Sequence, residues 1–191
     1  GMPELRKEIC NNIIKNGGAS YKEDEIVVTA GGQEAMFAIA LGILNSGDEM
    51  IAVAPGYNPY FQAAELAEAN PVMAKTYIDN NFAMTADAVE PLITNKTKIL
   101  VIINPCNPTG AVTPYEEVVK LSKLAIKHDL VVISDEIYFL EINARITQTS
   151  YLYDNIIRVQ ILVQGTFLPP RKHVVFSQPI KVYQGIDNPL Q

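Results

Sequence analysis

Residues 98–110 read Lys-Ile-Leu-Val-Ile-Ile-Asn-Pro-Cys-Asn-Pro-Thr-Gly, and this stretch decides the fold class. Between the leading lysine and the first asparagine every residue is apolar and most are β-branched, which is typical of a strand buried on both faces. Two Asn-Pro pairs then predict a rigid, extended loop, because proline restricts itself and the residue before it. Residues 113–116, Thr-Pro-Tyr-Glu, match a capping box and predict a helix that runs to about His128. A strand, a loop and a helix in this order make one unit of a parallel α/β fold.

The same alternation extends in both directions along the chain. Apolar β-branched runs predict strands at residues 26–29, 50–53, 72–77, 98–103 and 131–133. Apolar residues at helical spacing predict helices at residues 3–16, 33–44, 60–68, 85–94 and 113–128. Residues 1–138 are therefore predicted to form an α/β domain with a mostly parallel sheet and helices on both faces.

The pattern changes after about Phe139. Residues 139–191 do not continue the regular alternation, and we interpret them as a divergent second part of the chain. One further strand is expected near residues 155–163, and the rest of this part is expected to be irregular.

Bulk properties narrow the class of protein. The chain has 191 residues, enough for one domain with a hydrophobic core, and a net charge of −6. An acidic chain gives no electrostatic reason to expect nucleic acid or an anionic membrane surface as a partner. Its apolar runs are short, so no membrane span is expected, and the first residues lack the pattern of a secretory signal. Cys10 and Cys106 have no metal-like spacing, and two free thiols suit a cytoplasmic protein.

Four loops that follow predicted strands carry distinctive residues. Ligands of parallel sheets bind outside the carboxyl ends of the strands, so these loops form the candidate site. Residues 29–35, Thr-Ala-Gly-Gly-Gln-Glu-Ala, place glycines before a helix start, where backbone amides attract phosphate. Residues 54–60, Ala-Pro-Gly-Tyr-Asn-Pro-Tyr, hold Tyr57 on a rigid turn, where its ring can stack on a flat ligand. Taken singly, each pattern is also consistent with an ordinary tight turn or a tyrosine packed over a loop.

The other two loops carry polar side chains. Residues 104–110 contain both Asn-Pro pairs, and the second pair suggests that a side-chain amide is aimed at a partner. Residues 134–138, Ser-Asp-Glu-Ile-Tyr, place Asp135 directly after an apolar strand. A carboxylate in that place is costly unless it is paired, so it points to a cation or a protonated ligand. A helix cap or a surface acid is the alternative interpretation of this aspartate.

Together, in this order, the four loops resemble the cofactor-contacting segments of class I/II (fold-type I) aminotransferases, which depend on pyridoxal 5'-phosphate (PLP). The resemblance runs from about Pro3 to Tyr138. It implies the large domain of that family, PLP as the cofactor, and transfer of an amino group between an amino acid and a 2-oxo acid. A related PLP lyase of the same fold type and a non-catalytic PLP-binding remnant are the alternatives. A nucleotide-binding domain is disfavoured, because no Gly-x-Gly-x-x-Gly or P-loop pattern follows any strand.

The resemblance also implies which residues contact the cofactor. The backbone around Gly32 and Gln33 would hold the phosphate at a helix start. Tyr57 would stack on the pyridine ring. Asn107 would donate a hydrogen bond to the phenolic oxygen of PLP, and Tyr138 would support the same oxygen.

Two residues are implied in the chemistry itself. Asp135 would pair with the pyridine nitrogen and keep it protonated, which makes the ring an electron sink. The family also needs a Schiff-base lysine, in a segment whose start resembles residues 165–169, Gly-Thr-Phe-Leu-Pro. In that register Pro169 takes the place of the lysine, and proline has no amine. Lys172 is the nearest candidate for this role, ahead of Lys181, although the sequence around both favours solvated surface lysines.

These expectations describe a partial enzyme. The chain is expected to hold only the large-domain portion of an aminotransferase, with little or no activity, because the lysine motif is not recognisable. Active sites of this family lie at subunit interfaces, so the resemblance also implies a homodimer.

Overall fold

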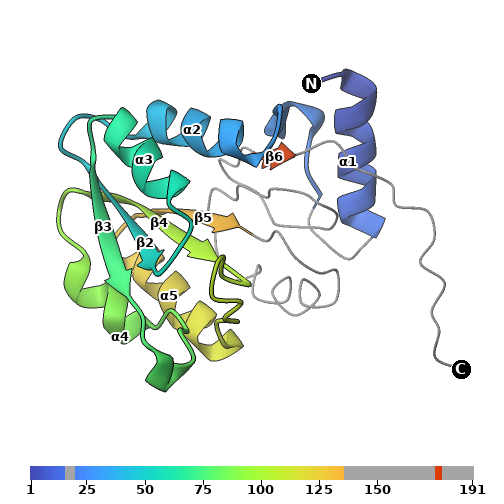
Figure 1. Cartoon of the computed structure of the whole chain (residues 1–191). Coiled ribbons are helices and arrows are strands. Elements are labelled where there is room, and N and C mark those ends of the chain that lie inside the picture. Colours follow the sequence, from blue (N-terminus) through green and yellow to red (C-terminus); the bar gives the residue numbers. More distant parts are fainter. Residues whose placement is uncertain (16–19, 136–174, 178–191) are drawn as a thin grey trace, which may run out of the picture.

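The structure, a computed structural model, describes residues 1–15, 20–135 and 175–177 (Figure 1). The helices are α1 (Pro3–Lys15), α2 (Gly32–Ile43), α3 (Pro59–Leu66), α4 (Ala86–Val89) and α5 (Tyr115–Lys127). The strands are β1 (Ile26–Val28), β2 (Glu49–Ala54), β3 (Asn70–Lys75), β4 (Thr97–Ile103), β5 (Val131–Asp135) and β6 (Val175–Ser177). Short 3₁₀ turns lie at Glu23–Glu25, Ile78–Asn80 and Glu90–Leu92.

Four of the strands form one parallel sheet, in the order β3-β2-β4-β5. Each of these strands is joined to the next along the chain by a segment that contains a helix, as parallel pairing requires. Strand β1 pairs in parallel with β6 in a separate two-stranded sheet. The register pairs Ile103 with Asp135, so β4 and β5 end side by side.

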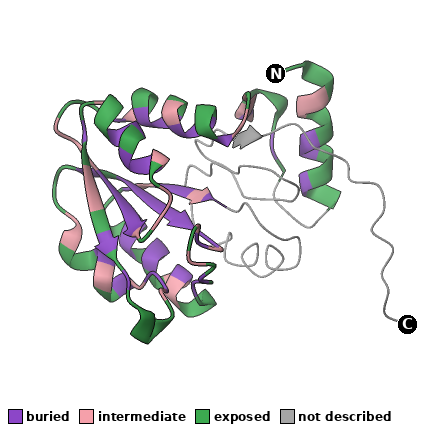
Figure 2. Ribbon diagram, viewed as in Figure 1, coloured by how far each residue is buried: buried purple, intermediate pink, exposed green. Residues whose placement is uncertain are grey.

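Helices cover both faces of the four-stranded sheet. In Figure 1, α2 and α3 lie on one side of the sheet, and α4 and α5 lie on the other. Figure 2 shows β2, β4 and β5 buried over most of their length, whereas the outward faces of the helices are exposed. The central strand β4 is apolar and buried from Ile99 to Ile103, as its sequence predicts for a strand covered on both faces. The predicted α/β fold with a parallel sheet is confirmed.

The start of α5 differs from the sequence prediction. Thr113 is not the N-cap: the helix begins at Tyr115, with Pro114 as the flanking residue and no side-chain cap. In a capping box the carboxylate of Glu116 would accept a hydrogen bond from the backbone N–H of Thr113. That N–H donates instead to Oδ1 of Asn104, and Thr113 is buried there. The capping-box prediction at residues 113–116 is therefore wrong, although the helix itself ends at Lys127, close to its predicted end.

The helix predicted at residues 85–94 is also interrupted. Its N-cap is Thr85, as predicted, and the Thr85 hydroxyl oxygen accepts a hydrogen bond from the N–H of Ala88. Helix α4 ends at Val89, and a 3₁₀ turn takes over at Glu90–Leu92. Pro91 lies in this turn, and proline lacks the N–H that a continuous helix needs.

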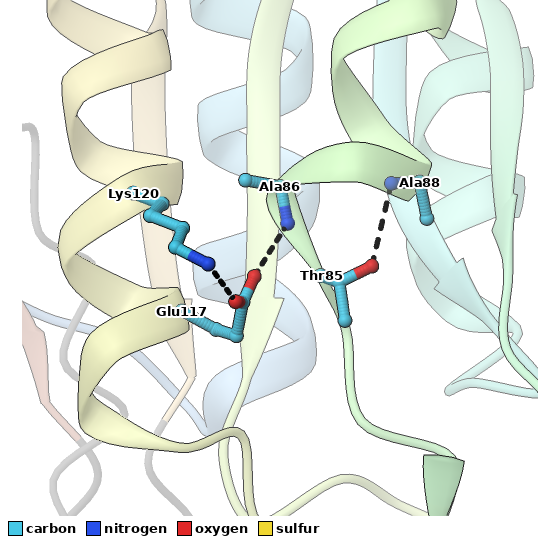
Figure 3. A network of polar contacts seen from close by, with 5 residues as sticks. All are labelled: Thr85, Ala86, Ala88, Glu117 and Lys120. Carbon is cyan, nitrogen blue, oxygen red and sulfur yellow. Dashed lines mark hydrogen bonds and ion pairs between the residues drawn. The ribbon is translucent and has the colours of Figure 1, made fainter. Parts of the chain in front are cut away.

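The side chain of Glu117 joins helices α4 and α5 (Figure 3). Its carboxylate accepts a hydrogen bond from the N–H of Ala86 at 2.9 Å and forms an ion pair with Lys120 at 2.6 Å. Glu117 thus satisfies a first-turn amide of α4 that has no acceptor within the helix. The hydrogen bond from Lys120, together with the one from the Ala86 N–H, lowers the pKa of the Glu117 carboxyl.

We predict that Glu117→Gln is less stable than the wild type at pH 7, because glutamine keeps an acceptor for Ala86 but loses the charge. A carboxyl whose pKa is lowered in the folded state stabilises the fold above its unfolded pKa, and this stabilisation is lost as the pH falls through the folded pKa. The difference in free energy of unfolding between wild type and variant should therefore disappear in acid. Urea unfolding from pH 3 to pH 7 measures it, with Glu116→Gln, an exposed neighbour on the same helix, as the control.

Candidate functional site

The carboxyl ends of β2, β4 and β5 meet at one edge of the sheet. Strand β2 runs parallel to β4, and β4 runs parallel to β5, so their following loops lie on the same side. Beyond the last strand pair, the N–H of Asn104 donates to the carbonyl oxygen of Asp135 at 2.9 Å. The loop after β4 is thereby held against the end of β5, and the edge carries residues 55–58, residues 104–110 and Asp135.

Asp135 is the buried acid of this edge. Asp135 has no exposed surface, and its Oδ2 accepts a hydrogen bond of 2.8 Å from the hydroxyl of Tyr60. Tyr60 is itself only 1% exposed, near the start of α3. Burial and, after it, the charge of Asp135 raise the pKa of Tyr60 well above its ordinary value. The tyrosine hydroxyl therefore stays protonated and donates a hydrogen bond to the carboxylate.

Tyr57 connects the loop after β2 to the start of α2. Its hydroxyl accepts a hydrogen bond of 2.9 Å from the side-chain amide of Gln33. Its ring meets the ring of Tyr60 edge to face, with centroids 6.3 Å apart and planes at 76°. Tyr57 is half-buried, so part of the residue remains accessible.

Helix α2 begins at the same place. Gly31 precedes it with a φ of 115°, a conformation that favours glycine. The carboxylate of Glu34 turns back to accept a hydrogen bond from the N–H of Ala30. The first amides of any helix lack acceptors within it, and in α2 these amides belong to Gly32, Gln33 and Glu34. This helix start has the chemistry of an anion site.

The loop after β4 is fixed by its own hydrogen bonds. Asn104 is buried, and its side-chain oxygen accepts from the N–H of Thr113 at 3.0 Å. The Sγ of Cys106 lies 3.6 Å from the carbonyl oxygen of Pro55, which joins this loop to the loop after β2. Asn107 follows, half-buried, in the tight turn that the N–H of Gly110 closes on the carbonyl oxygen of Cys106.

The structure thus brings several of the predicted residues to one region. Tyr57 and Gln33 are hydrogen-bonded to each other. Tyr60 links them to Asp135, because its ring packs against Tyr57 and its hydroxyl donates to the Asp135 carboxylate. Tyr138 and Lys172 lie outside the described residues, so their roles stay predictions from the sequence. The ligand contacts of the other predicted site residues also stay predictions. Sequence reasoning missed Tyr60, although its position three residues after Tyr57, at the start of a predicted helix, was a usable signal.

Two classes of site find no support in the described part of the chain. Residues 1–15, 20–135 and 175–177 contain no group of His, Cys, Asp and Glu side chains suited to hold a metal ion. Within the same residues, no helix is both long enough and apolar enough to cross a membrane.

The fold and the edge together define an α/β protein whose ligand site lies at the carboxyl ends of parallel strands. The family described as aminotransferase class I and II matches residues 1–140. The chain belongs to this family.

Individual relatives agree with the family match. The chain is 38% identical over 138 residues to an aspartate/prephenate aminotransferase of Thermus thermophilus, covering 72% of this chain and 36% of the relative. It is 37% identical over 139 residues to an aspartate aminotransferase of Pyrococcus abyssi, with the same coverage of 72% and 36%. The chain therefore spans about a third of the length of the curated relatives it matches.

Solved structures show the same fold. Aspartate aminotransferase from Thermus thermophilus with maleate superposes with a TM-score of 0.74 at 32% identity, over 84% of this chain and 42% of that one. Alanine aminotransferase from Pyrococcus furiosus superposes with a TM-score of 0.70 at 34% identity, over 73% of this chain and 36% of that one. These matches confirm the fold that the sequence predicts.

We predict that Asn104→Ala lowers the free energy of unfolding by about 1–3 kcal/mol, because the buried N–H of Thr113 loses its acceptor. Urea unfolding at pH 7 measures the change. Asn107→Ala is the matched control from the same loop, since no side-chain hydrogen bond of Asn107 is present among the described residues. Equal stabilities of the two variants would contradict the assignment of Asn104 as the residue that closes the loop.

Proposed function

We propose that the edge formed by β2, β4 and β5 binds PLP, and that the protein is a PLP-dependent aminotransferase acting on an amino acid and a 2-oxo acid. The observation that carries this proposal is Asp135, a buried carboxylate at the end of a parallel strand, whose backbone bonds to the loop after β4 and whose side chain bonds to Tyr60. A buried acid in such a place calls for a cationic partner, and a protonated pyridine nitrogen is one.

The described residues fit this cofactor in chemistry. PLP has a phosphate, a flat ring, a phenolic oxygen and a ring nitrogen. The start of α2 at Gly32 and Gln33 offers backbone amides for the phosphate. The ring of the half-buried Tyr57 would offer a stacking surface, and the Asn107 amide would offer a donor for the phenolic oxygen. Asp135 offers the negative charge for the ring nitrogen.

In the proposed mechanism each residue has a physical task. PLP, when bound, supplies an electron sink that stabilises negative charge at the α-carbon of the substrate. Asp135 holds a proton at the ring nitrogen, which strengthens that sink. Tyr57 would stack on the ring, and the amides at the start of α2 would hold the phosphate. Tyr138, by resemblance, supports the phenolic oxygen beside Asn107.

The proposal extends to residues and properties beyond the described part. Pro169 takes the family position of the lysine in the nearest register, and Lys172 is proposed only as the nearest lysine to bond to the cofactor in its place. For the same reason we propose that the 191-residue chain transaminates little or not at all by itself. A cytoplasmic homodimer is proposed from the resemblance, and sedimentation at high concentration tests the dimer.

We predict that the chain binds PLP and that Asp135→Asn weakens binding by about tenfold to a hundredfold. The variant replaces a charged partner of the ring nitrogen with a neutral amide, and hydrogen bonds to charged groups contribute about 1.5–3 kcal/mol. Titration of PLP followed by its visible absorbance measures the affinity. Asp129→Asn, an exposed aspartate at a positive φ that asparagine tolerates, is the control.

Borohydride reduction of the same mixture locates the lysine. A pyridoxyl group mapped to Lys172 by peptide mass, and lost in Lys172→Ala, supports the proposed lysine. No PLP binding at all, or equal binding by wild type and Asp135→Asn, would overturn the proposed site. Vigorous transamination by the purified chain would overturn the proposal that it is nearly inactive alone.

A further inference from the structure

Tyr60 is fixed before any ligand arrives. Its ring is almost fully buried, one residue after the proline that starts α3. The ring of Tyr57 packs against it edge to face, and Tyr57 is in turn held by Gln33. The Tyr60 hydroxyl therefore has little freedom, and its hydrogen bond to Oδ2 of Asp135 has a defined direction.

We propose that Tyr60 is a positioning residue: its hydroxyl fixes the carboxylate of Asp135 in the orientation that pairs with the ring nitrogen of PLP. This inference rests on the proposed function and deepens it. Tyr60 is not proposed to touch the cofactor or to transfer a proton, since it acts through Asp135.

Burial explains why such a residue is needed. An ionised carboxylate without exposed surface is costly unless a donor satisfies it. A tyrosine hydroxyl that donates to the charged oxygen offsets part of that cost and fixes the rotation of the carboxylate. The raised pKa of Tyr60 keeps its hydroxyl protonated, so it can donate throughout the neutral pH range.

The arrangement also couples the stacking ring to the charge. Tyr57 and Tyr60 lie three positions apart in one rigid segment that begins after β2. One tyrosine presents its ring to a flat ligand, and the other holds the acid that would meet the edge of that ligand. A shift of this segment would therefore move both contacts together.

The test uses the full chain, PLP labelled with ¹⁵N at its ring nitrogen, and the variant Tyr60→Phe, which removes only the hydroxyl. PLP affinity should fall about tenfold, as for the loss of one hydrogen bond to a charged group. The ¹⁵N chemical shift should show a smaller protonated fraction of bound PLP at pH 8 than in the wild type. Tyr77→Phe, which removes the hydroxyl of an exposed tyrosine, is the control and should match the wild type in both readouts.

The variant Asp135→Asn shows whether Tyr60→Phe affects PLP binding through the Asp135 carboxylate or through a general change in the structure. In that background, Tyr60→Phe should change the affinity by less than twofold and leave the ¹⁵N chemical shift unchanged, because the charge that Tyr60 positions is gone. Where Tyr60→Phe alone does not fold, the test compares Asp135→Asn with the double variant Asp135→Asn/Tyr60→Phe. The double variant leaves no buried charge without its donor.

The outcomes are distinct. Weaker binding by Tyr60→Phe with an unchanged ¹⁵N shift would make Tyr60 merely structural and overturn the inference, as would a further loss of affinity in the Asp135→Asn background. Unchanged binding and shift would overturn it as well, while the proposed PLP site stands. A wild-type chain that does not bind PLP would overturn the proposed function, and this inference with it.

Discussion

The hydrogen bond from Tyr60 to Asp135 is the interaction on which the rest of the site depends. It joins the start of α3 to the end of β5 across the core, and both side chains are buried. A buried carboxylate is stable only with a partner, so the tyrosine and the acid constrain each other. Tyr57 and Gln33 extend the same set of contacts to the start of α2, and Asn104 extends it to the loop after β4. The first three loops and Asp135, which lie far apart in the sequence, are thereby linked by direct contacts.

Local patterns predicted most of the elements in residues 1–135, because burial and helix periodicity act over short stretches of chain. They did not predict strand β6 (Val175–Ser177), which lies in a part expected to be irregular, and the strand expected near residues 155–163 lies outside the described residues. Residues 99–103 are apolar and mostly β-branched, and they form most of the central strand β4. The same local view failed at Thr113, whose N–H is taken by Asn104 from nine positions earlier. It also failed at Tyr60, whose partner Asp135 lies 75 positions away. Contacts between loops depend on strand register, which no short stretch of sequence specifies.

The candidate residues near Asp135 followed from the resemblance more than from the patterns, because each loop also had an ordinary structural interpretation. Membership in the aminotransferase family now gives that resemblance a firm basis over residues 1–140. The chain spans about a third of the length of its curated relatives, so the activity of the whole protein is a proposal built on this cofactor-binding part. The chemistry proposed for the site needs a lysine, and Lys172, the proposed one, lies outside the described residues.

The most direct test of the central claim is a crystal structure of the chain with bound PLP. The account predicts that the ring nitrogen lies within hydrogen-bonding distance of Asp135, the ring against Tyr57, and the phosphate at the first amides of α2. A cofactor found elsewhere on the molecule, or a phosphate at the α2 start with the ring turned away from Asp135, would contradict it.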